Sequence, residues 1–285
     1  MGRKISRRRI IQVISAVIYN SNFKGFAEGK IYKGGIKGVC VPGLNCYSCP
    51  GAVAACPLGS LQSALSEVKF KLPLYVAGTL MIFGILYGRA VCAFLCPFGL
   101  IQELLYKIPS PKLKKSAWTR RLSLLKYFIL LVFAVILPVY SLARAGAAVP
   151  AFCKYICPAG TLTGAIPLVA ANSSLQNIVG TLFNWKMLVL CTIIVSAIFI
   201  YRFFCRFICP LGAIYSFFNS QALVGIAVDE TKCSRCKICV RFCKMDACKI
   251  NDRECIRCGE CRQVCGSDAI IVRAEIKKSG RISGQ

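Results

Sequence analysis

The chain has 285 residues, 56% of them hydrophobic, and its 37 Lys and Arg outnumber 11 Asp and Glu, giving a formal net charge of +26. So apolar a chain is not an ordinary soluble domain, and basic residues beside apolar runs indicate membrane topology rather than nucleic-acid binding. Histidine is absent while cysteine occurs 20 times. This excludes histidine-ligated haem, Cys/His zinc fingers and histidine catalysis, and leaves disulfides, all-cysteine zinc, thiolate copper or iron–sulfur clusters.

Four apolar stretches, at residues 10–19, 72–87, 127–143 and 187–201, predict about four transmembrane helices. Each is shorter than the roughly 20 residues of a span, so flanking residues must complete the crossing. Lys and Arg number five in residues 1–9 and eight in 89–126, against three in 144–186 and six in the longer loop 24–71. The positive-inside rule therefore predicts a multi-pass protein of the cytoplasmic (inner) membrane with both termini in the cytoplasm and the loops 24–71 and 144–186 outside.

The motif Cys-Pro-x-Gly occurs four times, at Cys56, Cys96, Cys157 and Cys209, and a mildly amphipathic stretch follows each copy. The chain is therefore expected to contain two pseudo-repeats, each made of a span, an outer loop, a span and an inner loop. The predicted fold is an α-helical membrane domain at residues 1–227, followed by an α+β, bacterial-type two-cluster ferredoxin domain at residues 228–285.

The tail contains two runs with the spacing Cys-x2-Cys-x2-Cys-x3-Cys, which is typical of ferredoxins with two [4Fe–4S] clusters. In such runs the fourth cysteine binds the other cluster. The predicted ligands are Cys233, Cys236, Cys239 and Cys265 for cluster 1, and Cys255, Cys258, Cys261 and Cys243 for cluster 2. Two all-cysteine zinc sites are the alternative. Neither fourth cysteine precedes the usual proline, and the extra Cys248 is expected to be a buried thiol or a substitute for Cys243.

Two pairs with the spacing Cys-x3-Cys-Pro, Cys92 with Cys96 and Cys205 with Cys209, follow the second and fourth apolar stretches. Residues four apart share one face of a helix. The proline ends that helix and starts a new one, whose free amides favour an anion beside the sulfurs. Because the topology puts both pairs on the cytoplasmic side, they are predicted to share one inner [4Fe–4S] cluster. A thiolate copper site and unmetallated packing thiols remain alternatives.

Six more cysteines lie in the two outer loops. The repeat aligns Cys56 with Cys157 and Cys49 with Cys153, and these four are predicted to hold an outer [4Fe–4S] cluster. Possible substitutes are Cys40 and Cys46. Three disulfides are the competing interpretation, because thiols facing an oxidising compartment pair readily.

The segments VPGLNCYSCP and CPLGSLQ, the repeated Cys-x3-Cys-Pro pairs and the two-cluster tail resemble the NapH/MauN-type membrane polyferredoxins over residues 9–272. The membrane part of the nitrous oxide reduction regulator and the copper-reducing assembly factor of cbb3-type oxidases are similar. The resemblance implies an inner-membrane electron-transfer protein without a flavin, since the stretch TLTGAI lacks the acidic residue and second hydroxyl of flavin-attachment motifs.

The expected partners are membrane lipid, an extracytoplasmic reductase, flavoprotein or cytochrome, and a cytoplasmic ferredoxin-like or quinol donor. A copper-reducing assembly factor and a quinol dehydrogenase remain alternatives. Without histidine, a quinol site would need Glu103 or water as proton acceptor. The hydrocarbon layer is about 30 Å thick, too far for tunnelling between clusters at its two surfaces. Either the sites lie deeper than the apolar runs indicate, or something bridges them.

Overall fold

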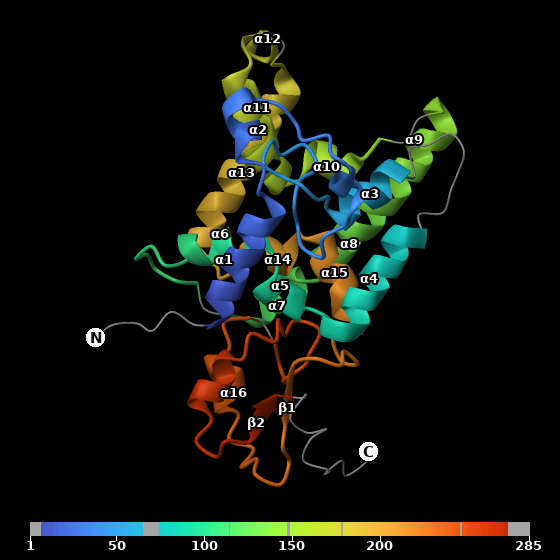
Figure 1. Cartoon of the computed structure of the whole chain (residues 1–285). Coiled ribbons are helices and arrows are strands. Elements are labelled where there is room, and N and C mark those ends of the chain that lie inside the picture. Colours follow the sequence, from blue (N-terminus) through green and yellow to red (C-terminus); the bar gives the residue numbers. More distant parts are fainter. Residues whose placement is uncertain are drawn as a thin grey trace.

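The chain forms a bundle of helices with a small mixed domain at one end (Figure 1). The computed structural model describes residues 7–64, 74–113, 115–146, 149–177, 179–245 and 247–272. Parts of three predictions lie outside the described residues: the start of the basic N-terminal run, residues 72–73 of the second predicted span, and the tail beyond residue 272.

The first half of the chain contains a cysteine-rich loop between helices. The loop follows α1 (Arg7–Tyr19), α2 (Phe23–Glu28) and the 3-10 helix η1 (Gly35–Gly38) and ends at α3 (Pro57–Ala64). A parallel bridge between Cys40 and Ala55 holds its two ends together. The half is completed by α4 (Leu74–Tyr87), α5 (Ala90–Phe94) and α6 (Pro97–Leu105).

The second half begins with a nearly continuous rod made of α7 (Ala117–Leu122), α8 (Leu125–Ile129), η2 (Leu130–Ile136) and α9 (Leu137–Ala145). Shorter elements follow: α10 (Ala151–Tyr155), η3 (Gly160–Ala165), α11 (Ile166–Ala171) and α12 (Ser173–Gln176). Both η2 and η3 are π-helical. Each lies just before a proline, Pro138 or Pro167, whose missing N–H and bulky ring disturb the regular helical hydrogen bonds. The half closes with α13 (Thr181–Phe199), α14 (Phe203–Phe207) and α15 (Pro210–Phe218).

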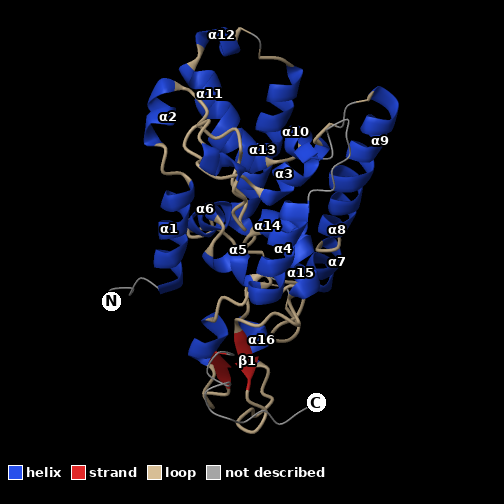
Figure 2. Cartoon of the chain, turned by 45° about the vertical axis from the view of Figure 1, so that its right-hand side comes forward, coloured by secondary structure: helices blue, strands red, loops and turns tan. Residues whose placement is uncertain are grey.

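The tail combines a two-stranded sheet with short helices. β1 (Ile226–Val228) pairs antiparallel with β2 (Ile270–Val272), and between them lie α16 (Ile238–Phe242) and the 3-10 helix η4 (Glu260–Val264). This mixed content agrees with the expected ferredoxin-type tail. Figure 2 shows the strands at the end of the molecule remote from α12.

Two helices of the described chain are long and apolar enough to cross a membrane: Ala117–Arg144 and Thr181–Phe199. They contain most of the third and fourth predicted spans. The first and second predicted spans form α1 and α4, of 13 and 14 residues, which are shorter than a bilayer crossing requires. The arrangement with four spans therefore stays a prediction.

The first helix has its polar face turned inward. Arg8 and Gln12 of α1 are buried, while Ile14 and Ile18 are 52% and 59% exposed. Apolar side chains also cover the outside of α13, where Leu188 is 59% exposed. A helix on the surface of a soluble protein has the opposite pattern. The bundle is thus apolar on the outside and holds its polar groups within.

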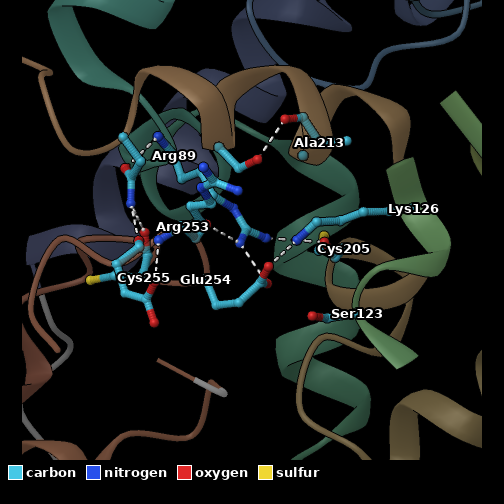
Figure 3. Close-up of polar contacts among 12 residues, drawn as sticks. Arg89, Ser123, Lys126, Cys205, Ala213, Arg253, Glu254 and Cys255 are labelled. Atoms are coloured by element: carbon cyan, nitrogen blue, oxygen red, sulfur yellow. Dashed lines mark hydrogen bonds and ion pairs between the residues drawn. The ribbon is translucent and has the colours of Figure 1, made fainter. Parts of the chain in front are cut away.

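Ion pairs join the bundle to the tail. Arg8 of α1 contacts Glu260 at 3.1 Å, and Arg89, just after α4, contacts Glu254 at 2.8 Å. Lys126 of α8 also pairs with Glu254, as Figure 3 shows. The start of α1, the end of α4 and the start of α8 therefore all lie at the tail end of the molecule, whereas α12 lies at the opposite end (Figure 1).

Candidate iron–sulfur sites

The two Cys-x3-Cys-Pro pairs predicted to share a cluster line one cavity of about 290 Å³. All four of its cysteines are buried: Cys92, Cys96, Cys205 and Cys209. Its other walls are apolar or aromatic and include Phe98, Phe204 and Tyr215. The structure thus brings together thiols that are more than a hundred residues apart in the chain. We call this the inner site.

The Cys-Pro step ends one helix and starts another, as predicted. Cys96 and Cys209 have extended backbones, with ψ of 114° and 115°, and each is followed by a proline that begins a new helix, α6 or α15. The N–H of Gly212, in the first turn of α15, donates to the sulfur of Cys209 at 3.5 Å. The amides at these helix starts therefore face the sulfurs, where they stabilise negative charge.

Two buried arginines, which were not among the predicted site residues, cross between the repeats. Arg202 donates from Nη1 to the carbonyl oxygen of Cys92 at 2.5 Å, and Arg89 donates from Nη2 to the carbonyl oxygen of Cys205 at 3.2 Å. Each arginine stands three residues before the first cysteine of its own pair. The shared pattern Arg-x2-Cys-x3-Cys-Pro-x-Gly could have indicated that these arginines belong to the site. It is absent around Cys153, where Pro150 takes that place.

The glycine of the motif makes room for this crossing. A Cβ on Gly99 would lie 3.0 Å from the carbonyl oxygen of Cys92 and 3.2 Å from Arg202 Nη1. A Cβ on Gly212 would lie 3.1 Å from the carbonyl oxygen of Cys205. Both contacts are tighter than most side chains make, so glycine lets the new helix pack on the cysteine helix without displacing its backbone.

Glu103 is the centre of a buried ion network. Its carboxylate accepts from Arg8 at 2.6 Å, from Arg202 at 2.7 Å and from the hydroxyl of Tyr201 at 2.6 Å. Burial opposes its ionisation, but Arg202 and Arg8 outweigh burial and lower the pKa of Glu103 to about 2. A carboxylate so strongly held in the ionised form is a poor proton acceptor at neutral pH, which argues against its suggested role in a quinol site.

A second group of thiols gathers between the loop before α3 and the α10 region. A Cβ on Gly160 would lie 3.5 Å from the sulfur of Cys46 and 3.8 Å from that of Cys157. Burial raises the pKa of the Cys153 thiol, and the charges of Cys157, Cys56 and Cys46 raise it further. The thiols that meet here are therefore Cys46, Cys56, Cys153 and Cys157, which we call the outer site.

The other two outer-loop cysteines make different side-chain or backbone contacts, although the amide of Cys49 donates to the carbonyl oxygen of Cys46 at 3.1 Å. The sulfur of Cys49 contacts the side-chain oxygen of Asn20 at 3.7 Å, and Cys40 pairs through its backbone with Ala55. The structure thus places Cys46, a suggested substitute, where the repeat had placed Cys49. All twenty cysteines are free thiols, so none of the three disulfides of the competing interpretation is formed.

The tail holds a cavity of about 540 Å³. All four predicted ligands of cluster 2 line it, together with one from cluster 1: Cys243, Cys255, Cys258, Cys261 and Cys239. Burial raises the pKa of Cys258 to about 11, so metal binding there has to displace a proton. Cys248 is exposed, which contradicts the prediction of a buried thiol, and the cavity is lined by Cys243 instead.

The two cysteine runs of the tail have matching backbones. Arg235 and Lys237 flank Cys236 with φ of 54° and 59°, and Arg257 and Gly259 flank Cys258 with φ of 52° and 76°. Left-handed residues at these points curl the chain so that successive amides turn toward one centre, which suits an anion. Cys236 itself is exposed and Cys265 is half-buried, so cluster 1 would lie nearer the surface than cluster 2.

The cysteines surround cavities rather than meeting at a point. Among the described residues, no group of three or more His, Cys, Asp or Glu converges closely enough for one metal ion. Four cysteines as the only metal-ligating side chains of the inner cavity fit a multi-atom iron–sulfur cluster held at its corners. The residues present therefore fit [4Fe–4S] clusters.

Residues of the tail, the inner site and the outer site share one continuous buried core. Met245 and Ile256 of the tail belong to the same buried core as the inner cysteines, and so do Cys56 and Cys157 of the outer site.

Three stretches of the chain, residues 72–116, 127–169 and 183–226, match the family model of a 4Fe–4S binding domain. Each stretch contains one Cys-x3-Cys-Pro pair, and the ferredoxin-type runs of the tail lie outside them. The match confirms the predicted internal repeat for three of its four copies. It locates the iron–sulfur signature in the helical bundle itself.

Several known proteins are similar. A protein of Methanocaldococcus jannaschii described as uncharacterized is 29% identical over 192 residues, covering 65% of this chain and 68% of its own length. The regulatory protein NosR of Pseudomonas aeruginosa is 31% identical over 171 residues, and that of Stutzerimonas stutzeri 30% over 172; each match covers 57% of this chain and 21% of NosR. No solved structure matches. Together with the two membrane-length helices, these matches support a membrane-associated, ferredoxin-like 4Fe–4S protein.

Proposed function

We propose that the protein is an inner-membrane electron carrier of the NapH/MauN type, which passes electrons between its tail and a redox partner beyond the outer site. The observation that carries this proposal is the inner site, where thiols from two distant repeats surround one cavity, in a buried core that includes residues of the tail. A [4Fe–4S] cluster bound at such a site accepts and releases one electron at a time.

The apolar outer surface supports a place in the membrane. Ile18 of α1 and Leu188 of α13 face outward, whereas Arg8 and Gln12 face inward and are hydrogen-bonded. Lipid would cover the apolar side chains, and water would not. The short α1 and α4 would then enter the bilayer as parts of the packed bundle rather than as independent spans.

The arrangement of the sites supports an ordered route through four clusters. Cluster 1 near the surface of the tail would exchange electrons with a donor, and cluster 2 would connect it to the inner site through the core around Met245 and Ile256. Arg235, Lys237 and Arg241 surround the cluster 1 cysteines and would attract an acidic ferredoxin-like donor. The outer site would exchange electrons with an extracytoplasmic reductase, flavoprotein or cytochrome.

Metal analysis tests the proposal. Full-length protein purified without oxygen is expected to contain about sixteen iron atoms and as many acid-labile sulfides per chain, four for each cluster. A value near eight would leave the tail clusters alone and contradict the proposal for the bundle. Copper in place of that iron would favour the copper-handling alternative.

The choice between Cys46 and Cys49 gives a second prediction. Because the sulfurs of Cys46 and Cys157 both lie at Gly160, whereas the sulfur of Cys49 contacts Asn20, Cys46→Ser is expected to lose about four iron atoms per chain, the content of one cubane. Cys49→Ser, its matched control in the same loop, should keep them. The reverse result would return the outer site to the ligand set that the repeat predicts.

A further inference from the structure

A buried glutamine contacts one sulfur of the inner site directly. Gln102 lies on α6, six residues after Cys96, and is 1% exposed. Its side-chain Nε2 donates to the sulfur of Cys205 at 3.0 Å. Arg89 and Arg202 cross between the repeats to carbonyl oxygens of inner cysteines. Gln102 also crosses between the repeats, but it reaches the atom that would hold iron.

The hydrogen-bond partners of Gln102 fix the orientation of its amide. Oε1 accepts from the backbone N–H of Phe204 at 2.9 Å, and Nε2 donates to the carbonyl oxygen of Phe98 at 3.4 Å. Exchanging the amide oxygen and nitrogen would place oxygen against the carbonyl oxygen and the amino group against the N–H. The donor that faces the Cys205 sulfur is therefore held by groups on both repeats.

The two phenylalanines that hold the amide also form apolar walls of the inner cavity. The rings of Phe98 and Phe204 pack edge to face, with their centroids 5.2 Å apart. Both residues are buried, and so is Cys205. In surroundings that exclude water, a hydrogen bond is electrostatically stronger than at the surface. The contact between Gln102 and the Cys205 sulfur therefore acts on a poorly screened charge.

The outer copies of the motif make a different contact at the same position. Six residues after the Cys-Pro cysteine, these copies carry Gln62 and Thr163. Gln62 donates to the carbonyl oxygen of Phe133 at 2.9 Å, and Thr163 donates to that of Ala159 at 2.8 Å. These contacts go to main-chain oxygens, whereas Gln102 donates to a sulfur. The sulfur contact is thus not a general consequence of the motif.

We infer that Gln102 is a positioning residue that sets the reduction potential of the inner site through its N–H on the Cys205 sulfur. The inference rests on the proposed function. In the step, cluster 2 of the tail loses one electron and the inner site gains it; no bond forms or breaks, and no proton moves. An N–H that points at a ligand sulfur stabilises the added negative charge and raises the reduction potential. Gln102 therefore makes the inner site a better acceptor of electrons from the tail.

The test uses Gln102→Met in the full-length protein purified without oxygen, with Gln62→Met as its matched control. Methionine has nearly the length of glutamine but has no N–H to donate. Gln102→Met is expected to lower the midpoint potential of the inner cluster, measured by EPR-monitored titration. The ratio of reduced to oxidised inner cluster at a fixed ambient potential should fall about tenfold, a shift of about 59 mV for one electron.

The control has the same place in the motif and the same burial. Gln62 is fully buried, so Gln62→Met removes an equally buried amide without touching Cys205. Its inner cluster should titrate at the wild-type potential, and the tail clusters should do so in both variants. The signal of the inner cluster is identified as the one that is lost in Cys205→Ser.

A second measurement detects the hydrogen bond itself. With ¹⁵N in the glutamine side chains, pulsed EPR of the reduced wild-type protein should show a hyperfine coupling between an amide nitrogen and the inner cluster. That coupling should be lost in Gln102→Met and kept in Gln62→Met. No coupling in the wild type would contradict the contact between Gln102 and the Cys205 sulfur.

The outcomes separate this inference from the proposed function. Iron near eight per chain in the wild type would overturn the proposed function. If Gln102→Met holds all four clusters and its inner cluster keeps the wild-type potential, the inference is wrong while the electron carrier stands. Gln102→Asn, with its amide one methylene shorter, should also lower the potential and decides the matter if the methionine variant does not load. Loss of the inner cluster from both variants would show that Gln102 assembles the site rather than tunes it, and would overturn the inference.

Discussion

Replacing Cys96 by serine is expected to stop electron flow between the tail and the outer site. Cys96 lines the inner cavity and is in contact with the loop that leads to the outer site. Its loss removes one of four thiolates around an otherwise apolar cavity and leaves one iron of a cubane without a cysteine ligand. In proteoliposomes, electron flux from external dithionite to enclosed ferricyanide should fall to the level of protein-free vesicles, while the EPR signals of the tail clusters persist.

Cys191→Ser is the matched control for this substitution. Cys191 is an exposed thiol on α13 and is outside every cavity described above. The Cys191→Ser protein should retain both the iron content and the electron flux of the wild type. Wild-type flux in Cys96→Ser would show that electrons bypass the inner site.

Replacing Glu103 by glutamine is expected to destabilise the folded protein by about 3–5 kcal/mol, because it leaves buried positive charge without its partner. Glu103 is the shared acceptor for Arg8 and Arg202, both of which are at least 95% buried. Arg202 would then keep its hydrogen bond to the carbonyl oxygen of Cys92 but lose its carboxylate partner. The melting temperature in detergent should fall well below that of the wild type.

The control for this variant is Glu28→Gln. Glu28 is 58% exposed and pairs with Lys30 at 3.8 Å, and such surface pairs contribute little to stability. Its melting temperature should equal that of the wild type. If Glu103→Gln also melts at the wild-type temperature, the buried network does not hold the bundle together.

Local sequence rules predicted the parts of the sites that depend on near neighbours. The Cys-Pro step fixed where α6 and α15 begin, because proline restricts the residue before it and suits a helix start. The spacing of the tail cysteines likewise predicted which thiols line the tail cavity. The first feature depends on adjacent residues, and the second on short, regular spacings within each cysteine run.

Features of the sites that depend on long-range packing could not be predicted from neighbouring residues. The segment from Cys46 to Cys56 has no regular helix or strand, so aligning it with the repeat could not decide between Cys46 and Cys49. The packing of the loop before α3 on the inner site depends on the contact of Gly43 with Cys96, which joins residues far apart in the chain.

Two features of the sequence indicate buried polar residues, although the predictions did not include them. Arg89 and Arg202 stand at the same distance before their cysteines, and an arginine beside an apolar span has to find a partner. Arg8, Gln12 and Ser15 follow helical spacing on one face of α1, and all three are buried. Polar residues with that periodicity in an apolar helix indicate an inward polar face.

Counting clusters in single and double cysteine variants tests most directly whether the two repeats share one site. Native mass spectrometry of the full-length protein is expected to find four [4Fe–4S] clusters in the wild type and three in either Cys96→Ser or Cys209→Ser. The double variant should also hold three, because both cysteines would serve the same cluster. Two clusters in the double variant would show that each pair holds metal on its own, and the shared inner site would be wrong.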